Sequence, residues 1–456
     1  MQDARRGPLS DESPSTSQLP GDVPSWVVPG VFVLVLLLAV SRSPYVLAHG
    51  RFWAEEGRVH FRYMLSHDGP GRLLFVYGHS GYFDAFCNAA TWLAAQVSLD
   101  RAPLVTVWLS FGVIVSLLWV TLYWPSALLP TISSRIAAAV LLVVGTIAIP
   151  AVWLNSLEAQ TYLALVTLLL LFVRLRKLTR LRFWFGAVVL AMAGLSGVYA
   201  DLMAPLFIVR ALKQRTRRTV IYAAVAGLSA VIQLAVVAHL HASGQTGSTK
   251  LVFRGVGTIV RNVAGYHIAG FVFGPDWAKT VHRSSDTIVG FAALCCFAIV
   301  VLTFLAAVLA RVPDRRVALA LAGAFLIEEL GVNFGAGSDS GHRFAVVPVG
   351  ILILMLVHGT ATGRNAGLQV MGIGVCALVL VFGLSTFWSY QSDTLRCRGC
   401  PDWSQQVQQW QDGRSSRLAI WPYPDWYIPL PPRPTRRTAG ATPAAARTRS
   451  LAGARR

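Results

Sequence analysis

About eleven strongly apolar stretches between residues 26 and 389 constrain the fold of this chain more than any other feature. Most are near the ~20 residues that an α-helix needs to cross a bilayer, and basic residues gather in alternate gaps between them. The expected spans are 26–46, 103–124, 136–153, 157–173, 183–199, 202–212, 219–241, 287–310, 317–334, 343–359 and 367–389. The sequence therefore predicts an all-α fold, a polytopic transmembrane helical bundle.

The composition agrees with a membrane protein. Hydrophobic residues make up 54% of the 456 residues and charged residues only 13%, which is too apolar for a soluble domain of this length. The net charge of +19 is typical of some nucleic-acid-binding proteins, but here the basic residues lie in short loops and in the tail. In such positions they anchor topology at membrane lipids, so no nucleic-acid partner is expected.

The distribution of basic residues predicts the orientation of the bundle in the plasma membrane. With a cytoplasmic N-terminus, the long loops 47–102 and 242–286 and the C-terminal segment lie outside. The segment 202–212 contains Pro205 and is either a full span or a re-entrant half-helix. The dense basic clusters then all lie inside: Arg174, Arg176, Lys177, Arg180, Arg182, Lys213, Arg215, Arg217, Arg218, Arg311, Arg315 and Arg316.

Four regions follow from the same pattern. Residues 1–24 are expected to form a disordered cytoplasmic lead, 25–390 the transmembrane domain, 391–430 a small exterior cap and 431–456 a disordered basic tail. In the cap, Cys397 and Cys400 are expected to form a disulfide, because they lie outside and lack further metal ligands nearby. Four cap tryptophans either stack on sugars or, as we favour, pack the cap onto the membrane domain: Trp403, Trp410, Trp421 and Trp426.

Acidic residues near a membrane boundary are costly unless they face water or a partner, so each is a candidate for function. Glu55 and Glu56 open the first exterior loop beside Trp53. Desolvation and like-charge repulsion can raise a carboxylate pKa, which suits a general base. The alternative is a solvated helix start with an interfacial Trp.

Two more acidic positions fall on the same predicted face. Asn155 and Glu158 lie in the tight turn between two spans, and Asp201 follows the next outward-going span. Converging carboxylates could bind a divalent cation such as Mg²⁺ or Mn²⁺, or position a hydroxyl acceptor. Alternatively, Asn155 or Ser156 caps a helix whose first turn favours Glu158, and Asp201 caps the helix containing Pro205.

A cationic element completes the candidate site. Arg343 begins a span after an exterior turn, with His342 beside it, and its guanidinium fork suits a phosphate. The alternative is an interfacial anchor that snorkels to the headgroups. Glu328 and Glu329 lie inside the preceding span and are expected to face the bundle interior or a cavity, where a buried cation could pair with them.

These residues carry a resemblance to a known family. Phe52-Trp53-Ala54-Glu55-Glu56-Gly57, the run from Tyr77 through Tyr82 to Asp84, and Glu158 and Arg343 resemble the C-type (GT-C) membrane glycosyltransferases, in particular bacterial members. The resemblance covers residues 26–390. It implies that Glu55, Glu56 and Glu158 are catalytic, that Tyr82, Asp84 and Arg343 bind substrate, and that the donor is a polyprenyl-phosphate sugar. Their place on the same predicted face adds Asn155, Asp201 and His342 to the expected substrate-binding residues. Many members carry an Asp where this chain has two Glu, which leaves the base open between Glu55 and Glu56.

The chemistry of such a donor fits these residue types. A sugar on a polyprenyl phosphate carries its own leaving group, so one carboxylate deprotonates the acceptor and one cation holds the departing phosphate. In-line attack inverts the anomeric carbon, and the acceptor is a cell-envelope glycan or an exported glycoprotein. Two alternatives stay open: a transporter or flippase of lipid-linked or anionic substrates, and a glycan polymerase or ligase that uses Arg254 and Arg261 of the second long loop.

Overall fold

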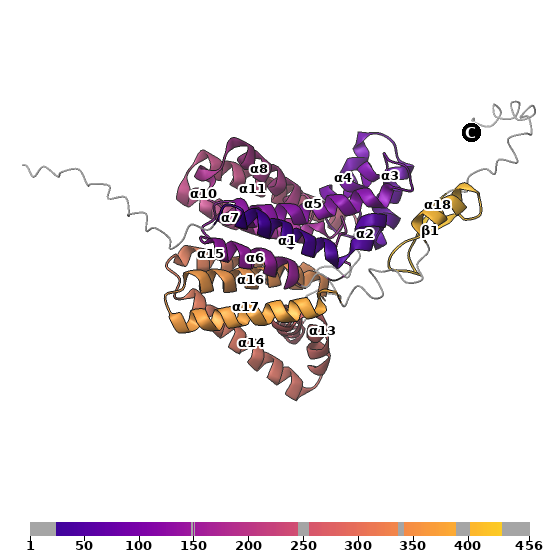
Figure 1. The fold of residues 1–456 in the computed structure, drawn as a ribbon. Coiled ribbons are helices and arrows are strands. Elements are labelled where there is room, and N and C mark those ends of the chain that lie inside the picture. Colours follow the sequence, from indigo (N-terminus) through magenta and orange to yellow (C-terminus); the bar gives the residue numbers. More distant parts are fainter. Residues whose placement is uncertain are drawn as a thin grey trace, which may run out of the picture.

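The computed structural model describes residues 24–146, 149, 151–244, 255–335, 342–388 and 402–430. The predicted all-α class is confirmed, since this part of the chain is helical apart from one small two-stranded sheet (Figure 1). The predicted lead and tail lie outside the described residues except for Pro24, and so does the predicted Cys397–Cys400 disulfide.

The helices and strands follow one another along the chain in three groups. The first part contains α1 (Val27–Arg42), α2 (Pro44–His49), η1 (Glu56–Phe61), α3 (Arg62–Ser66), η2 (Pro70–Leu74), α4 (Ala85–Ala94), α5 (Ala102–Tyr123) and α6 (Ile132–Val144). The middle contains α7 (Ala159–Phe172), η3 (Leu175–Lys177), α8 (Arg180–Gly194), α9 (Tyr199–Leu202), α10 (Ala204–Gln214) and α11 (Arg217–Ala242). The last part contains α12 (Val256–Asn262), η4 (Val263–Ile268), α13 (Ala269–Ser284), α14 (Ile288–Leu309), α15 (Arg315–Gly335), η6 (His342–Ala345), α16 (Val346–Thr362), α17 (Ala366–Phe387), α18 (Trp403–Gln411), β1 (Arg417–Ala419) and β2 (Tyr427–Pro429).

Side-chain caps fix where several of the long apolar helices begin. The Thr131 and Thr216 hydroxyls accept from backbone amides in the first turns of α6 and α11, and Thr287 and Asn365 do the same for α14 and α17. Each cap satisfies an amide that the helix itself leaves without a partner, which matters most where water is scarce.

Two helices form the centre of the bundle. All fourteen residues of α7 are buried, and so is the run from Val346 to Gly359 in α16. These helices are apolar on every side, which is the pattern of a helix surrounded by others, and they pack against each other. By contrast, only 28% of the apolar window is buried in α11 and in α14, and 22% in α17. Their exposed apolar faces are therefore suited to lipid.

Within the described residues, six helices are long and apolar enough to cross a membrane: α5, α11, α14, α15, α16 with the residues just before it, and α17. The helices α1, α6 and α7 are apolar but have only 16, 13 and 14 residues, fewer than the ~20 of a perpendicular span. The predicted total of eleven spans stays a prediction.

The predicted spans 183–199 and 202–212 form a bent pair instead of two straight helices. Together α8 and the α9–α10 segment are long and apolar enough for one span, but they bend by 110°. The bend falls where Gly197 has a φ of +135°, not at Pro205. Pro205 lies in the first turn of α10, where a missing amide costs nothing. The segment is therefore a broken span or a re-entrant loop.

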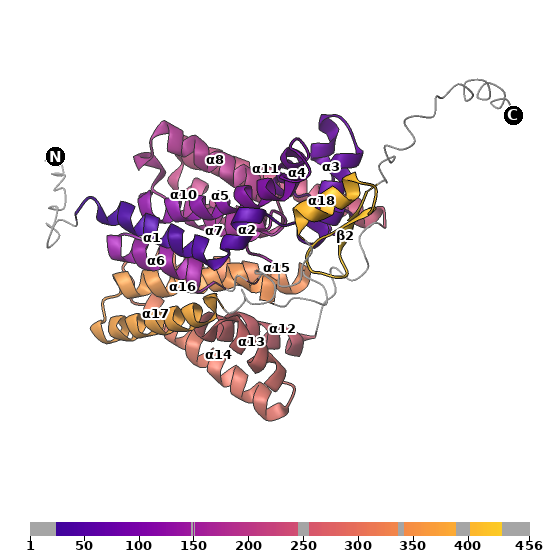
Figure 2. The same ribbon diagram turned by 45° about the vertical axis from the view of Figure 1, so that its right-hand side comes forward.

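One end of the bundle, here called the cap end, gathers α2, α3, α4, α18 and the two strands (Figure 1, Figure 2). The predicted exterior loop 47–102 and the cap 402–430 thus lie together, although about three hundred residues separate them. They share a small apolar core that includes Phe52, Phe61, Val407, Ile420 and Ile428. The cap is therefore packed onto the first loop.

At the other end of the bundle, where α10 lies (Figure 1), two arginines donate hydrogen bonds to the carbonyls of helix ends. This end is here called the arginine end. Arg210 donates to the carbonyls of Leu170, Leu171 and Val173 at 3.0, 2.6 and 2.5 Å, which closes the end of α7. Arg218 donates in the same way to Leu175 and Leu178. The last carbonyls of a helix have no intrahelical donor, so these guanidiniums satisfy groups that would otherwise be orphaned.

Candidate functional site

The acidic segment of the first loop is held by the cap. Trp53 and Trp421 form a parallel β-bridge, in which the Trp421 amide donates to the Phe52 carbonyl at 3.1 Å and the Ala54 amide donates to Trp421. The two indole rings stack with centroids 6.4 Å apart. Trp403, Trp410 and Trp426 also pack against the small core, so the contacts of the four tryptophans agree with the packing interpretation, and stacking on sugars stays a prediction.

Gly57, the last residue of the acidic motif, is required by the closeness of that contact. A Cβ at Gly57 would lie 2.8 Å from Cβ of Phe52 and 2.9 Å from Cδ1 of Ile420. Contacts that short do not occur between carbon atoms, so a larger residue would push the cap away from η1. The glycine therefore belongs to the junction that positions Glu55 and Glu56.

Glu56 is fully buried, and both oxygens of its carboxylate accept hydrogen bonds from other residues. One oxygen accepts from the amide of Ser156 at 2.9 Å and from its hydroxyl at 2.5 Å, and the other accepts from the amide of Trp53 at 3.1 Å. Burial raises the pKa of Glu56, while these hydrogen bonds and the nearby Arg51 oppose the rise. Glu56 thus joins the first loop to the turn between α6 and α7.

Arg51 makes a second junction between the same two segments. Its guanidinium donates to the carbonyl of Trp153 at 2.7 Å and lies 4.7 Å from the centroid of the Trp53 ring. The turn is also braced from within, since the Asn155 amide donates to Ala151 and its oxygen accepts from Leu157. Arg51 and Asn155 therefore both act on the shape of the turn that carries Glu158.

Glu158 forms an ion pair with Arg343. The two side chains approach to 3.6 Å, and they are 10% and 42% exposed respectively. Glu158 itself occupies the N-cap position of α7 and its side chain accepts no capping bond there. Asn155 is therefore not the N-cap residue, although its oxygen accepts from the amide of Leu157 in the turn before the helix. Arg343, at the start of α16, also lies 4.8 Å from the ring of Phe344. Because nearly half of the Arg343 side chain stays accessible, it has capacity for a further anion.

Glu55 acts on the same guanidinium through its charge. It is partly exposed, and its charge acts on both Arg343 and the Tyr77 hydroxyl. Burial raises the pKa of Tyr77, and Glu55 adds to the rise. Unlike the Glu56 carboxylate, the Glu55 carboxylate takes part in no hydrogen bond within the described part of the chain. The two neighbouring glutamates therefore differ sharply in environment.

Tyr82 and Asp84 form another wall of the site. The Tyr82 hydroxyl accepts from the amide of Gln160 at 2.8 Å, and burial raises its pKa well above the usual value, with Asp84 and Glu158 adding to the rise. Asp84 caps α4 through a 2.9 Å bond from the amide of Cys87. Burial also raises the pKa of Asp84 well above its usual value, and the charge of Glu158 contributes. Tyr82, Asp84, Glu158 and Arg343 therefore share one electrostatic environment.

Asp201 and Glu329 take no part in the contacts of this cluster. Asp201 lies in α9 and does not cap the helix of Pro205, because the N-cap of α10 is Met203. Both Asp201 oxygens are buried without a hydrogen-bond partner in the part of the chain that is described. The side chain of His342 lies outside the described residues. Of the two carboxylates inside α15, Glu329 pairs with His267 of η4, with 2.7 Å between Oε1 and Nδ1. His267 is thus a buried partner of the kind expected for this pair of glutamates.

Sequence reasoning missed Gln160, which holds the Tyr82 hydroxyl. Its signal is a polar amide in the otherwise apolar helix α7, where such a group is expected to have a partner. Gly197 makes room for it, because a Cβ there would collide with the Gln160 amide. Ser156 and Tyr199, whose hydroxyl interacts with Glu158 and Arg343, were likewise overlooked as site components.

The described residues contain no group of three or more His, Cys, Asp or Glu side chains arranged to hold a metal ion. A role for Mg²⁺ or Mn²⁺ stays a prediction. No known family model matches the chain, and no curated protein matches it significantly. What the site does must therefore be argued from its own chemistry.

Proposed function

We propose that this protein is an integral membrane glycosyltransferase of the GT-C type that transfers a sugar from a polyprenyl phosphate to an acceptor hydroxyl. The observation that carries the proposal is the Arg343–Glu158 ion pair at 3.6 Å, with Glu55 acting on the same guanidinium. The group brings carboxylates and one accessible guanidinium together at the cap end. Such a site suits a reaction that needs a base and a phosphate holder.

Glu55 is the better general base of the two neighbouring glutamates. The Glu56 carboxylate is committed to Ser156 and Trp53, so it has little capacity to accept a proton from a substrate. Glu55 is partly exposed, and its charge acts on the Arg343 guanidinium of the ion pair. In this proposal Glu55 catalyses, Glu56 positions the loop, and Glu158 orients the Arg343 fork.

The proposed reaction is a single displacement. Glu55 takes the proton of the acceptor hydroxyl as its oxygen attacks the anomeric carbon. The bond from that carbon to the phosphate oxygen breaks, and the electron pair leaves with the polyprenyl phosphate, whose charge Arg343 holds. The anomeric configuration inverts. Tyr82, with its hydroxyl held by Gln160, lines the sugar side of the site, and Asp84 stabilises that wall.

The proposed orientation follows from the two ends of the bundle. The arginine end would face the cytoplasm, in agreement with the positive-inside rule, and the cap end would face the exterior of the plasma membrane. The acceptor, a cell-envelope glycan or an exported glycoprotein, would enter at the cap end. The donor chain would lie among the apolar helix faces.

The test is sugar transfer by the full chain in membranes, with a polyprenyl-phosphate sugar as donor. Glu55→Gln is expected to lower the rate about 10²- to 10⁴-fold, because general base catalysis is lost. Arg343→Ala is expected to lower it about 10²- to 10³-fold. Matched controls are Asp68→Asn, an exposed acid of the same loop, and Arg414→Ala, an exposed cap arginine. Normal rates in both Glu55→Gln and Arg343→Ala would defeat the proposal.

One observation favours a second function, the transport of a lipid-linked or anionic substrate. Glu328 is fully buried inside α15 with no partner for either oxygen among the described residues, and it neighbours the His267–Glu329 pair. Ionisable groups inside spans often mark ion or substrate pathways. Substrate movement across vesicles that depends on Glu328 but not on Glu55 would favour a transporter, and the reverse would favour the transferase.

A further inference from the structure

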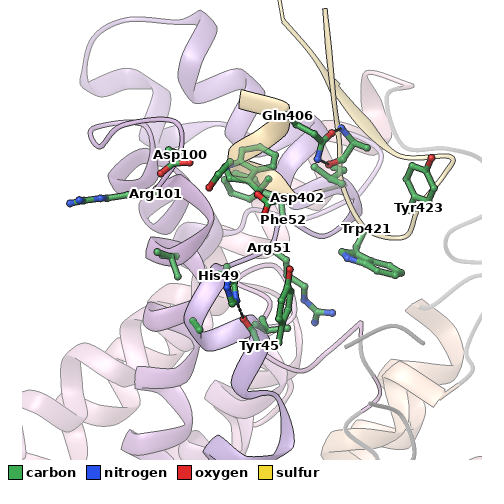
Figure 3. A pocket seen from close by; sticks show the side chains of 18 residues that line it. Tyr45, His49, Arg51, Phe52, Asp100, Arg101, Asp402, Gln406, Trp421 and Tyr423 are labelled. Atoms are coloured by element: carbon green, nitrogen blue, oxygen red, sulfur yellow. Dashed lines mark hydrogen bonds between the residues drawn. The ribbon is translucent and has the colours of Figure 1, made fainter. Parts of the chain in front are cut away.

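A cavity of about 250 Å³ lies where the cap meets the first loop (Figure 3). Its walls come from three parts of the chain: the α2 segment, the start of α5 and the cap. Gly50, Arg51 and Phe52 line it and come just before the acidic motif. The cavity is therefore joined to the candidate site through a short stretch of chain.

Aromatic rings form two of these walls. Trp421 and Tyr423 come from the cap, and Tyr45 comes from α2, where its ring stacks on His49 with centroids 4.2 Å apart (Figure 3). Tyr423 and Tyr45 are 48% and 40% exposed, which is a high fraction for such large side chains. The indole of Trp403 is held in place because its N–H donates to the carbonyl of Leu99. The cavity therefore offers flat apolar faces whose positions are fixed by the cap.

The polar groups around these faces carry both signs of charge. Asp100 and Asp402 contribute carboxylates, Arg51 and Arg101 guanidiniums and His49 an imidazole. The carboxylates disfavour a phosphate or another anion, and the number of polar groups disfavours a purely apolar ligand. Hydroxyl groups both donate and accept, so a polyhydroxylated neutral molecule satisfies such a mixed set. Flat apolar faces between convergent polar groups are the usual character of a small-molecule site.

We propose that this cavity binds a neutral sugar unit of the acceptor glycan. The identification of this sugar as part of an acceptor rests on the proposed function. The binding of a sugar in the cavity does not. The Cα atoms of Arg51 and Glu55 are four residues apart, so at most about 14 Å of extended chain separates them. A glycan held in the cavity by one unit can thus present a hydroxyl a few units further on to Glu55.

Binding is measured with the purified full chain in detergent, by calorimetry with neutral di- and trisaccharides of mannose, arabinose and glucose. Tyr423→Ala is expected to weaken binding about tenfold, because one stacking face is lost, and Tyr423→Phe is expected to keep it within about twofold. Asp100→Asn is expected to weaken binding about fivefold. The matched control Asp68→Asn, an exposed acid outside the cavity, is expected to bind as the unaltered chain does.

Three outcomes would overturn the cavity proposal: binding of no saccharide in the set, equal binding by Tyr423→Ala and Tyr423→Phe, or displacement of the saccharide by inorganic phosphate at equal concentration. The transfer assay separates this from failure of the proposed function. A chain that transfers sugar with an acceptor KM unchanged by Tyr423→Ala refutes the cavity alone. A chain that binds saccharide through Tyr423 but transfers none refutes the transferase and leaves a sugar-binding site.

Discussion

The two ends of the bundle use charge in opposite ways. At the arginine end, the guanidiniums of Arg210 and Arg218 donate to the carbonyls that close α7 and η3, so each cation has backbone partners. At the cap end, acidic side chains outnumber their cationic partners. Glu158 and Glu55 both act on one accessible guanidinium, that of Arg343, and the charge of Glu158 also acts on Asp84.

The two ends therefore differ in what their charged side chains can do. At one end they hold the backbone in place, and at the other they are accessible to a ligand. A cation whose hydrogen bonds all go to carbonyls stabilises helix ends and has little capacity for a ligand. A guanidinium that is 42% exposed and paired at 3.6 Å can still take an anion. Substitutions at the two ends should therefore affect different measurements: stability at the arginine end, and transfer or ligand binding at the cap end.

Glu56 is the exception at the cap end, because its carboxylate holds backbone and side-chain groups in place. Of the substitutions considered, Glu56→Ala should cause the largest loss of stability. Glu56→Ala leaves the Ser156 amide, its hydroxyl and the Trp53 amide without an acceptor. The free energy of unfolding is expected to fall by about 3–5 kcal/mol, as for other broken buried charged contacts. Thermal unfolding in detergent measures this. The matched control Glu55→Ala should stay within about 0.5 kcal/mol, and an equal loss there would erase the contrast between the two glutamates.

His60 should make the cap end sensitive to pH. Asn88 donates both amide protons to the carbonyls of Leu73 and Phe75, so its oxygen accepts from Nδ1 of His60. Nε2 is then the unprotonated nitrogen, and no hydrogen-bond partner reaches it within the described structure. Burial lowers the pKa of His60 from 6.5 to about 4, while the Asn88 bond opposes the change. Between these two values the unfolded imidazole is protonated and the folded one is neutral.

Stability should therefore rise with pH from about 4 to 6.5, by about 3 kcal/mol, and this contribution should be flat above 6.5. The raised pKa values of Glu56 and Asp84 act in the opposite direction, because their folded forms bind protons more tightly than their unfolded forms. Thermal unfolding is measured across pH for the unaltered chain and for His60→Gln. The difference in the free energy of unfolding between the two gives the contribution of His60. A difference that does not vary between pH 4 and 6.5 would show that His60 is not buried in the neutral form.

Arg210 tests the arginine end. Arg210→Met leaves three carbonyls at the end of α7 without their donor, and the free energy of unfolding should fall by about 1–3 kcal/mol. The transfer rate per folded molecule should not change. The matched control is Arg176→Met, because Arg176 is an exposed arginine of the same region. A loss of transfer without a loss of stability would contradict the division between the two ends.

The membrane class and the meeting of Glu158 with Arg343 were accessible to sequence reasoning. Both predictions rest on two local patterns, the apolar runs and the alternation of basic loops. These patterns assign residues to one face of the membrane without knowledge of the packing. The number of spans was less accessible. The apolar run 136–153 reads as one span, yet α6 ends at Val144, and Val152, Trp153 and Leu154 are buried in turns. Hydropathy does not distinguish a buried turn from a buried helix.

The difference in environment between Glu55 and Glu56 was not accessible to sequence reasoning. It depends on Ser156, which lies 100 residues away from Glu56, and on Trp421 of the cap. No periodicity links such positions, because the contacts arise only when the loop, the turn and the cap have packed. The pairing of Glu329 with His267, 62 residues apart, is a second case of the same kind.

The smallest effect is expected for the ion pair of Arg414 with Asp412 in the cap. The two side chains are 64% and 46% exposed and approach to 2.5 Å, closer than Arg343 and Glu158. Solvent screens an exposed pair, so Arg414→Ala should change the free energy of unfolding by less than about 1 kcal/mol and leave transfer intact. Arg343→Ala should also change stability little, since that arginine is nearly half exposed, but it should abolish most of the transfer. Equal transfer rates for these two variants would mean that the position of Arg343 among the carboxylates carries no chemistry.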